Sequence, residues 1–228
     1  MSHDVLYLEL VEALQAGGCP LCRLGRRASD SYLNALIYEG VTDPGLRERL
    51  RDARGPCRRH AWRMARERGS VLGTAIIYRD IVNTLAKALE TSETAGPHWA
   101  RGKRASLSRM LAPSAGCPAC LLEADAVQRS AKTLLKHLDS SEVAEVYVAA
   151  GGLCLPHLQA TLALAGEEAA RTLAGWQAAV YRRLRDELDE LIRKHDHRFA
   201  GEPVSEREAQ SWERAVAGVA GEEEKRSE

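Results

Sequence analysis

Apolar residues recur along most of the chain at intervals of three and four, the spacing of one face of an α-helix. The clearest stripe predicts a helix over residues 167–194 and consists of Leu173, Trp176, Val180, Leu184, Leu188, Leu191 and Ile192. A second long helix is expected over 71–89, where Ile and Leu occupy several faces. No stretch shows the convincing alternation of a β-strand, so the pattern predicts an all-α protein.

Residues that begin and end helices agree with this pattern. Asp43 followed by Pro44 is typical of a helix start, with a capping carboxylate and proline in the first turn. Ser205 and Glu208 have the spacing of a capping box, and a short helix carrying Trp212 should follow. Glycines stand where helices should stop, at positions 69, 151, 152 and 166.

One pair of motifs occurs twice. The CPxC motif of 19–22 recurs at 117–120, and the CxxH motif of 57–60 recurs at 154–157. The first cysteines of the two motifs are 38 residues apart in one copy (57 − 19) and 37 in the other (154 − 117). The repeat predicts two related helical halves, each closed by one metal site.

The expected domain limits follow from the repeat. Residues 1–95 form the first metal-binding half, 105–198 the second, and 199–228 a C-terminal turn, short helix and frayed tail. The joint between the halves is predicted at 91–104, which is rich in glycine, proline and small polar residues.

All six cysteines and two of the seven histidines belong to the repeated motifs. The candidate ligands are Cys19, Cys22, Cys57, His60, Cys117, Cys120, Cys154 and His157. Three thiolates and one imidazole suit tetrahedral zinc, and four protein ligands leave no open position for substrate. The motifs therefore predict two structural zinc ions.

The pairing of the motifs has two solutions. Pairing within each half is the simpler one, because the spacing repeats; pairing of the CPxC of one half with the CxxH of the other is the alternative. Three alternatives are weaker. Iron–sulfur clusters more usually have four cysteine ligands, disulfides within each CxxC would leave the CxxH pairs unexplained, and free core cysteines would hardly account for six cysteines in a duplicated pattern.

The chain is expected to be cytoplasmic. Its first residues lack the basic start and unbroken apolar run of a secretory signal, and no window of about 18 apolar residues predicts a membrane span. Cysteines in a reducing compartment are more often metal ligands than disulfides.

Three functional hypotheses follow. Closed ligation, with no phosphate-binding loop or nucleophile elbow, favours a non-enzymatic interaction or adaptor protein with a protein partner. The arginine-rich segment Arg47–Arg68, with Arg58, Arg59 and Arg63 as candidate contacts, permits a nucleic-acid-associated factor, although the chain is neutral overall and its aromatic content is 5%. The thiolates could also serve as a redox or metal sensor.

The chain resembles an uncharacterised prokaryotic family, a domain of unknown function. The resemblance rests on both CPxC and both CxxH motifs, the turn at 41–44, the segment 75–78 and the end from His197 to Trp212. It spans almost the whole chain and implies one family unit, not two fused modules. It implies no activity.

Overall fold

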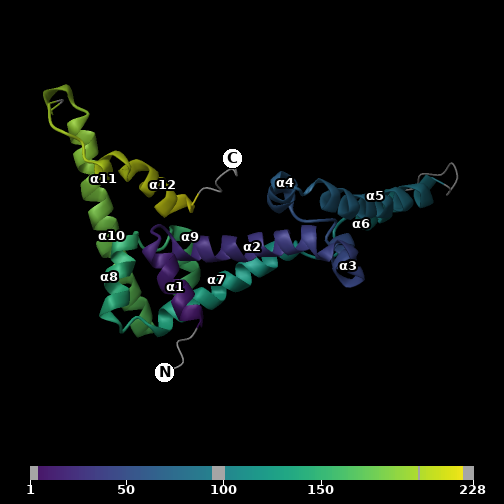
Figure 1. Cartoon of the computed structure of the whole chain (residues 1–228), viewed down its shortest axis with the longest axis horizontal. Helices are drawn as coiled ribbons and strands as arrows, with labels where there is room; N and C mark the ends of the chain where they lie inside the picture. Colours follow the sequence, from purple (N-terminus) through teal and green to yellow (C-terminus); the bar gives the residue numbers. More distant parts are fainter. Residues whose placement is uncertain (1–4, 94–100, 200, 223–228) are drawn as a thin grey trace. The chain divides into compact units, whose positions relative to one another are not determined.

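The computed structural model describes residues 5–93, 101–199 and 201–222, and every regular element among them is helical (Figure 1). The predicted all-α class is therefore confirmed. The first helices are α1 (Val5–Gln15), α2 (Pro20–Tyr38), α3 (Pro44–Asp52), α4 (Arg58–Arg66) and α5 (Val71–Glu93). They are followed by α6 (Arg101–Leu111), α7 (Pro118–Lys136), α8 (Ser141–Ala150), α9 (Leu155–Leu162), α10 (Glu167–Lys194), α11 (Glu206–Ala209) and α12 (Ser211–Ala220). The centre of the predicted joint, 94–100, lies outside the described residues.

The helices form two compact units, and each unit contains segments from both halves of the sequence. Among the described residues, unit 1 combines residues 5–26 with those from 125 to 222, and unit 2 contains those from 27 to 124. Both boundaries fall inside helices, one in α2 and one in α7. The units therefore differ from the expected division into 1–95 and 105–198, because each draws on both halves.

Unit 1 has its own apolar core, built from α1, α8, α9, α10 and the parts of α2 and α7 that belong to it. Leu10, Leu134, Tyr147, Leu153 and Leu173 are all fully buried there. The centre of this core also holds a polar network. The Tyr147 hydroxyl donates to the side-chain oxygen of Gln177, whose amide nitrogen donates to the Leu153 carbonyl at 3.0 Å. Every buried polar group of the network has a partner, as stability requires.

Unit 2 has a second, separate core. It is formed by the C-terminal part of α2 with α3, α4 and α5, and its buried residues include Leu36, Leu50, Met64, Ile77 and Ile81. The carboxylate of Asp80 on α5 accepts hydrogen bonds from Arg47 and Arg51 of α3 at 3.3 and 2.7 Å. These hydrogen bonds connect α3 to α5.

Several helix ends follow the sequence signals. The Asp43 side chain accepts the backbone N–H of Leu46 at 2.9 Å, with Pro44 in the first turn of α3. Ser205 and Glu208 form the predicted capping box of α11. The long helix α10 covers the predicted 167–194, and α5 extends four residues beyond the expected end at Leu89.

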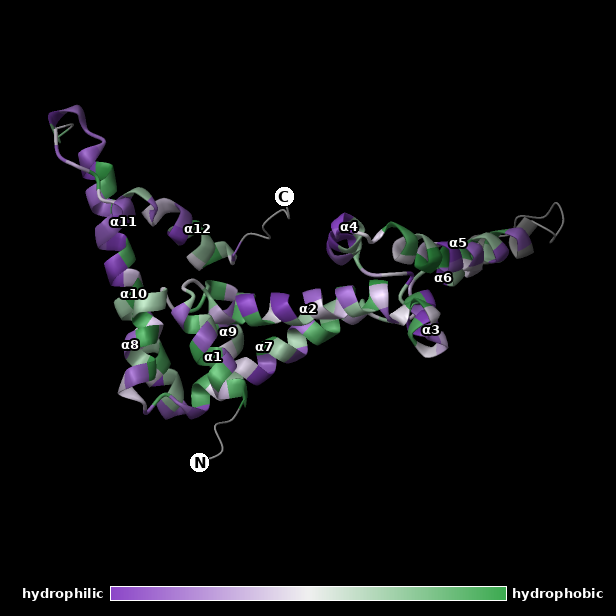
Figure 2. Ribbon diagram, in the orientation of Figure 1, coloured by the Kyte–Doolittle hydropathy of each residue, from purple (hydrophilic) through white to green (hydrophobic). Residues whose placement is uncertain are grey.

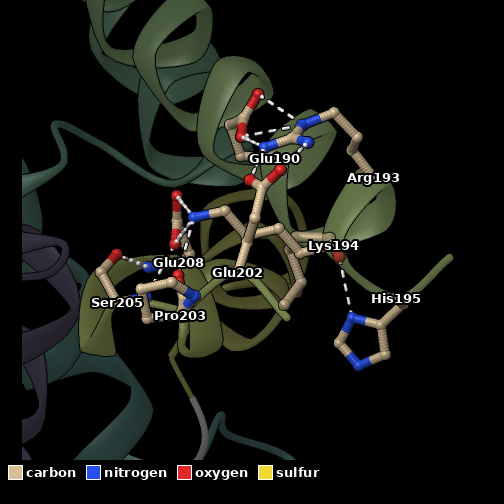
Figure 3. Close-up of polar contacts among 9 residues, drawn as sticks. Glu190, Arg193, Lys194, His195, Glu202, Pro203, Ser205 and Glu208 are labelled. Carbon is tan, nitrogen blue, oxygen red and sulfur yellow. Dashed lines mark hydrogen bonds and ion pairs between the residues drawn. The ribbon is translucent and has the colours of Figure 1, made fainter. Parts of the chain in front are cut away.

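The segment after α10 folds back against that helix. Lys194 donates to both carboxylate oxygens of Glu208 at 2.8 Å, and Arg193 bonds Glu190 and Glu202 (Figure 3). Both α11 and α12 contact α10, and α12 also contacts α9. Hydrophilic residues dominate the last turns of α10, where this network lies (Figure 2).

Among the described residues, no single helix combines the length and apolar character needed to cross a membrane. The two N-terminal helices α1 and α2 meet that test only as a pair, across a bend of 115°.

Candidate metal centres

The eight predicted ligands form two groups of four. Site 1 consists of Cys19, Cys22, Cys154 and His157, and site 2 of Cys57, His60, Cys117 and Cys120. Within each group all four ligand atoms lie within 4.8 Å of one another, so each group could hold a metal ion. Each CPxC motif meets the CxxH motif of the other half. The expected pairing within each half is therefore wrong, and the exchanged alternative is the arrangement observed.

Site 1 lies entirely within unit 1. The Nδ1 atom of His157 is 3.4, 3.3 and 3.2 Å from the sulfur atoms of Cys19, Cys22 and Cys154. The sulfurs of Cys22 and Cys154 are 3.6 Å apart. Cys19 and Cys154 are buried, so two of the three thiols of this site are shielded from solvent.

Site 2 lies entirely within unit 2 and has the same geometry. Nδ1 of His60 is 3.4, 3.5 and 3.3 Å from the sulfurs of Cys57, Cys117 and Cys120. The sulfurs of Cys57 and Cys120 are 3.5 Å apart. His60 is fully buried, whereas the three thiols are partly exposed.

Helix N-termini hold the ligands in both sites. Cys19 and Cys117 directly precede the prolines that begin α2 and α7, and Cys57 and Cys154 are the N-cap residues of α4 and α9. Free N–H groups and the helix dipole favour a thiolate at such positions. Two helix N-termini therefore meet at each site and stabilise the negative charge that a metal requires.

Backbone hydrogen bonds bring the two motifs of each site together. In unit 1 the N–H of Gly18 donates to the Ala150 carbonyl at 2.8 Å. In unit 2 the N–H of Ser114 donates to the Asp52 carbonyl, also at 2.8 Å. The residues joined in each unit lie a few positions before the CPxC and the CxxH motif, so the fold itself aligns the ligand pairs.

The turn before each CxxH motif has left-handed backbone geometry. In unit 1 it is made by Gly151 and Gly152, with φ of 98° and 68°. A Cβ on Gly152 would lie 2.6 Å from the side-chain oxygen of Gln177, so only glycine fits. In unit 2 the first of these positions is Arg54, with φ of 55°. Its guanidinium donates to the Met110 and Leu111 carbonyls at the end of α6, which offsets the backbone strain.

In each site the pKa of one thiol is lowered and that of another is raised. Hydrogen bonds with Cys154 and Cys22 raise the pKa of the Cys19 thiol, and burial raises the pKa of the Cys120 thiol to about 12. Hydrogen bonds from Cys154 and Cys19 lower the pKa of the Cys22 thiol. Burial alone would raise the pKa of the Cys117 thiol, but backbone and side-chain hydrogen bonds lower it to about 7. The hydrogen bond to Glu123 raises the pKa of His60 to about 9. Burial opposes the charge on His157, but the thiols of Cys154 and Cys22 raise its pKa to about 10. In each group the protonation of a thiol therefore depends on the protonation of the neighbouring thiols and of the imidazole.

Site 2 has a carboxylate behind its histidine. Nε2 of His60 lies 3.1 Å from Glu123, which also accepts from Arg59. A carboxylate on the second ring nitrogen fixes the ring and raises its basicity as a metal ligand. Glu123 stands three residues after Cys120, where Gly25 follows Cys22 in the other copy. The spacing alone could have marked it as a position on the ligand face of α7.

Site 1 instead receives a carboxylate from the C-terminal segment. The Cys19 N–H donates to Glu222 Oε1 at 2.8 Å, just beyond α12. A Cβ on the neighbouring Gly221 would lie 4.0 Å from the Cys22 sulfur, so the chain passes close to the centre here. No local sequence signal connects residues separated by 203 positions.

The candidate nucleic-acid contacts all lie on α4, but two of the three bond within the protein. Arg59 bonds Glu123, and Arg63 bonds Ser29 and Asp30 on α2. Arg58 is exposed. Further along the basic segment, Arg47 and Arg51 bond Asp80.

These features define an all-helical protein with two Cys3His groups, each within its own compact unit. The chain belongs to a family of unknown function, DUF6062, whose model matches residues 1–226. An uncharacterized 23.9 kDa protein in the xynA 3′ region of Caldicellulosiruptor sp. (strain Rt8B.4) is 37% identical over 75 residues, which cover 33% of this chain and 36% of that protein. The match thus covers only about a third of the relative's length. No solved structure gives a significant match.

Proposed function

We propose that each Cys3His group holds one zinc ion in a structural role and that the protein is a non-enzymatic interaction or adaptor protein. The observation that carries the proposal is the spacing of the ligand atoms. A tetrahedral ion with bonds of about 2.3 Å to sulfur and 2.0 Å to nitrogen separates two sulfurs by about 3.8 Å, and a sulfur and a nitrogen by about 3.5 Å. One sulfur pair in each site is 3.5–3.6 Å apart, and the sulfur-to-nitrogen distances are 3.2–3.5 Å, close to these edges; all ligand atoms of a site lie within 4.8 Å of one another.

The same distances speak against two alternative chemistries. In an iron–sulfur cluster the four protein ligands are divided between two or four irons, so some of them lie farther apart than the ligands of a single ion. A disulfide needs sulfurs about 2.05 Å apart, and all six cysteines are free. Four protein ligands on one ion also leave no coordination position for a substrate, which supports a structural role over a catalytic one.

Metal analysis and thermal unfolding test this proposal together. We expect two zinc ions per chain, a colourless protein, and a marked fall in melting temperature on chelation that zinc restores. Structural zinc in small domains contributes on the order of 10 kcal/mol, comparable with the stability of a whole domain. An unchanged melting temperature after complete zinc removal would contradict the structural role.

The adaptor role is supported by an exposed apolar stripe on α12. Trp212, Val216 and Val219 lie four and three residues apart and are 55–60% exposed. Tryptophan is enriched among the residues that dominate the binding energy of protein interfaces, and a contiguous exposed apolar patch often marks an interaction site. Replacing Trp212 and Val216 with serine should abolish capture of a partner while leaving both zinc ions and the helix content unchanged. Retained capture would exclude this stripe as the interface.

A nucleic-acid role is supported by fewer residues than the whole arginine-rich segment, and these residues lie on α4. Arg58, Trp62 and Arg66 are exposed and lie four residues apart, so cations flank an aromatic ring on one helix face. Such a face can combine phosphate contacts with base stacking. Replacing Arg58 and Arg66 with glutamine should flatten the salt dependence of RNA binding, whereas the same change at Arg171 and Arg185 should not. Failure to retain mixed RNA or DNA at about 50 mM salt would exclude this role.

A further inference from the structure

A cavity of about 90 Å³ lies in unit 1 beside site 1. Its walls are formed by the loop before α2, the end of α8, the middle of α10 and residues 214–218 of α12. Its apolar lining includes Val148, Val180, Leu184 and Ala217, and the ligands Cys19 and Cys154 form part of one wall. The cavity is thus a small apolar space that reaches the metal centre.

Three arginines also line this cavity around a single acid. Arg183 of α10, Arg207 of α11 and Arg214 of α12 all bond Glu187, the last at 2.6 Å. Only 13% of the Glu187 side chain is exposed, whereas the three arginine side chains are 37–48% exposed. Glu187 carries one negative charge against the three cations that bond it.

The N–H donors of the arginines that Glu187 does not occupy also matter for ligand binding. A guanidinium carries five N–H donors, and a carboxylate has only about four acceptor sites. Glu187 therefore cannot occupy all the donors of three arginines. A second carboxylate at this position would find a ready set of charge-assisted hydrogen bonds.

We propose that the cavity binds a short-chain monocarboxylate, with its carboxylate on the arginines and its aliphatic tail in the apolar space. The volume sets the tail length. An apolar protein cavity of about 150 Å³ accommodates benzene, so about 90 Å³ suits a tail of three or four carbons. Butyrate is a probe of this size, and none of the proposed zinc chemistry is required for its binding.

A chain-length series tests the proposal by calorimetry on the zinc-loaded protein. Each buried methylene strengthens binding about fourfold, so butyrate should bind about tenfold or more tightly than acetate. Hexanoate should gain nothing further, because its tail exceeds the cavity. No heat of binding at about 10 mM butyrate, where millimolar affinity would be detected, would overturn the proposal. Inorganic phosphate that binds as tightly as butyrate would overturn the role of the apolar space.

Two variants locate the ligand. Arg183→Gln should weaken butyrate binding about tenfold, whereas Arg182→Gln makes the same charge change on an adjacent exposed residue outside the cavity and should leave it unchanged. Gly218→Leu should fill the cavity, because Gly218 lines it and a Cβ there meets nothing within 4 Å. With zinc content and helicity retained, this variant should bind butyrate no better than acetate. Equal effects of the two arginine changes, or undiminished butyrate binding by the glycine variant, would contradict the assignment.

Discussion

The candidate metal centres of unit 1 and unit 2 have the same ligand set, three cysteines and one histidine, but are supported differently. In site 2 the support is local, since Glu123 on the ligand helix α7 holds the ring of His60. In site 1 the support comes from the end of the chain, where Glu222 accepts from the Cys19 backbone after α12. A duplicated ligand set can thus keep its inner geometry while its surroundings diverge, and the two ions should respond differently to distant changes.

Acid should have the largest effect, and it should act on both sites. With pKa values raised to about 9 and 10, His60 and His157 are protonated at neutral pH in the metal-free protein and must lose that proton to bind metal. Zinc affinity should therefore rise with pH, and each released proton costs about tenfold in affinity for every unit that the pH falls below its pKa. Competition with a chromophoric chelator at pH 6, 7 and 8 measures this. An affinity independent of pH would show that no proton is displaced.

Glu123→Gln should separate the two sites. Loss of a carboxylate behind a ligating histidine weakens metal binding about 10- to 100-fold. Site 2 should be weakened to this extent and site 1 should keep its affinity. Glu222→Gln is the matched variant, and it should affect site 1 alone and less strongly, because it touches a backbone N–H and not a ligand side chain. Equal weakening of both sites by Glu123→Gln would show that the units are coupled.

Glu187→Gln should loosen the C-terminal support of site 1. Burial opposes the charge of Glu187, but Arg207 and Arg214 lower its pKa, so its ion pairs stabilise the folded state above the carboxyl's unfolded pKa. That stability is lost as the pH falls through the lowered folded value. At neutral pH the variant should lose about 1–3 kcal/mol of stability and release zinc faster from site 1 than from site 2.

The control for this variant is Glu167→Gln, whose pair with Arg171 on the same helix is almost fully exposed. Exposed pairs of this kind contribute about 0–1 kcal/mol. An equal loss in both variants would mean that α11 and α12 are not anchored through Glu187.

The sequence predicts the helices and the ligands well because both depend on local signals. The stripe from Leu173 to Ile192 marks α10, and Ser205 with Glu208 marks the start of α11. The pairing of the motifs was not predictable from their spacing, because the intervals of 38 and 37 residues say nothing about which helices pack together. The supports at Glu222 and Arg54 were missed for the same reason, since each joins segments far apart in the chain.

The most direct test of the exchanged pairing compares two double variants by zinc content. Cys22 and Cys154 belong to one site in the structure, whereas Cys22 and Cys57 belong to different sites. Cys22→Ser/Cys154→Ser should therefore retain one zinc ion per chain, and Cys22→Ser/Cys57→Ser should retain none. The opposite result, with one ion in the second variant and none in the first, would show that each half of the sequence closes its own site and would contradict the interleaved fold.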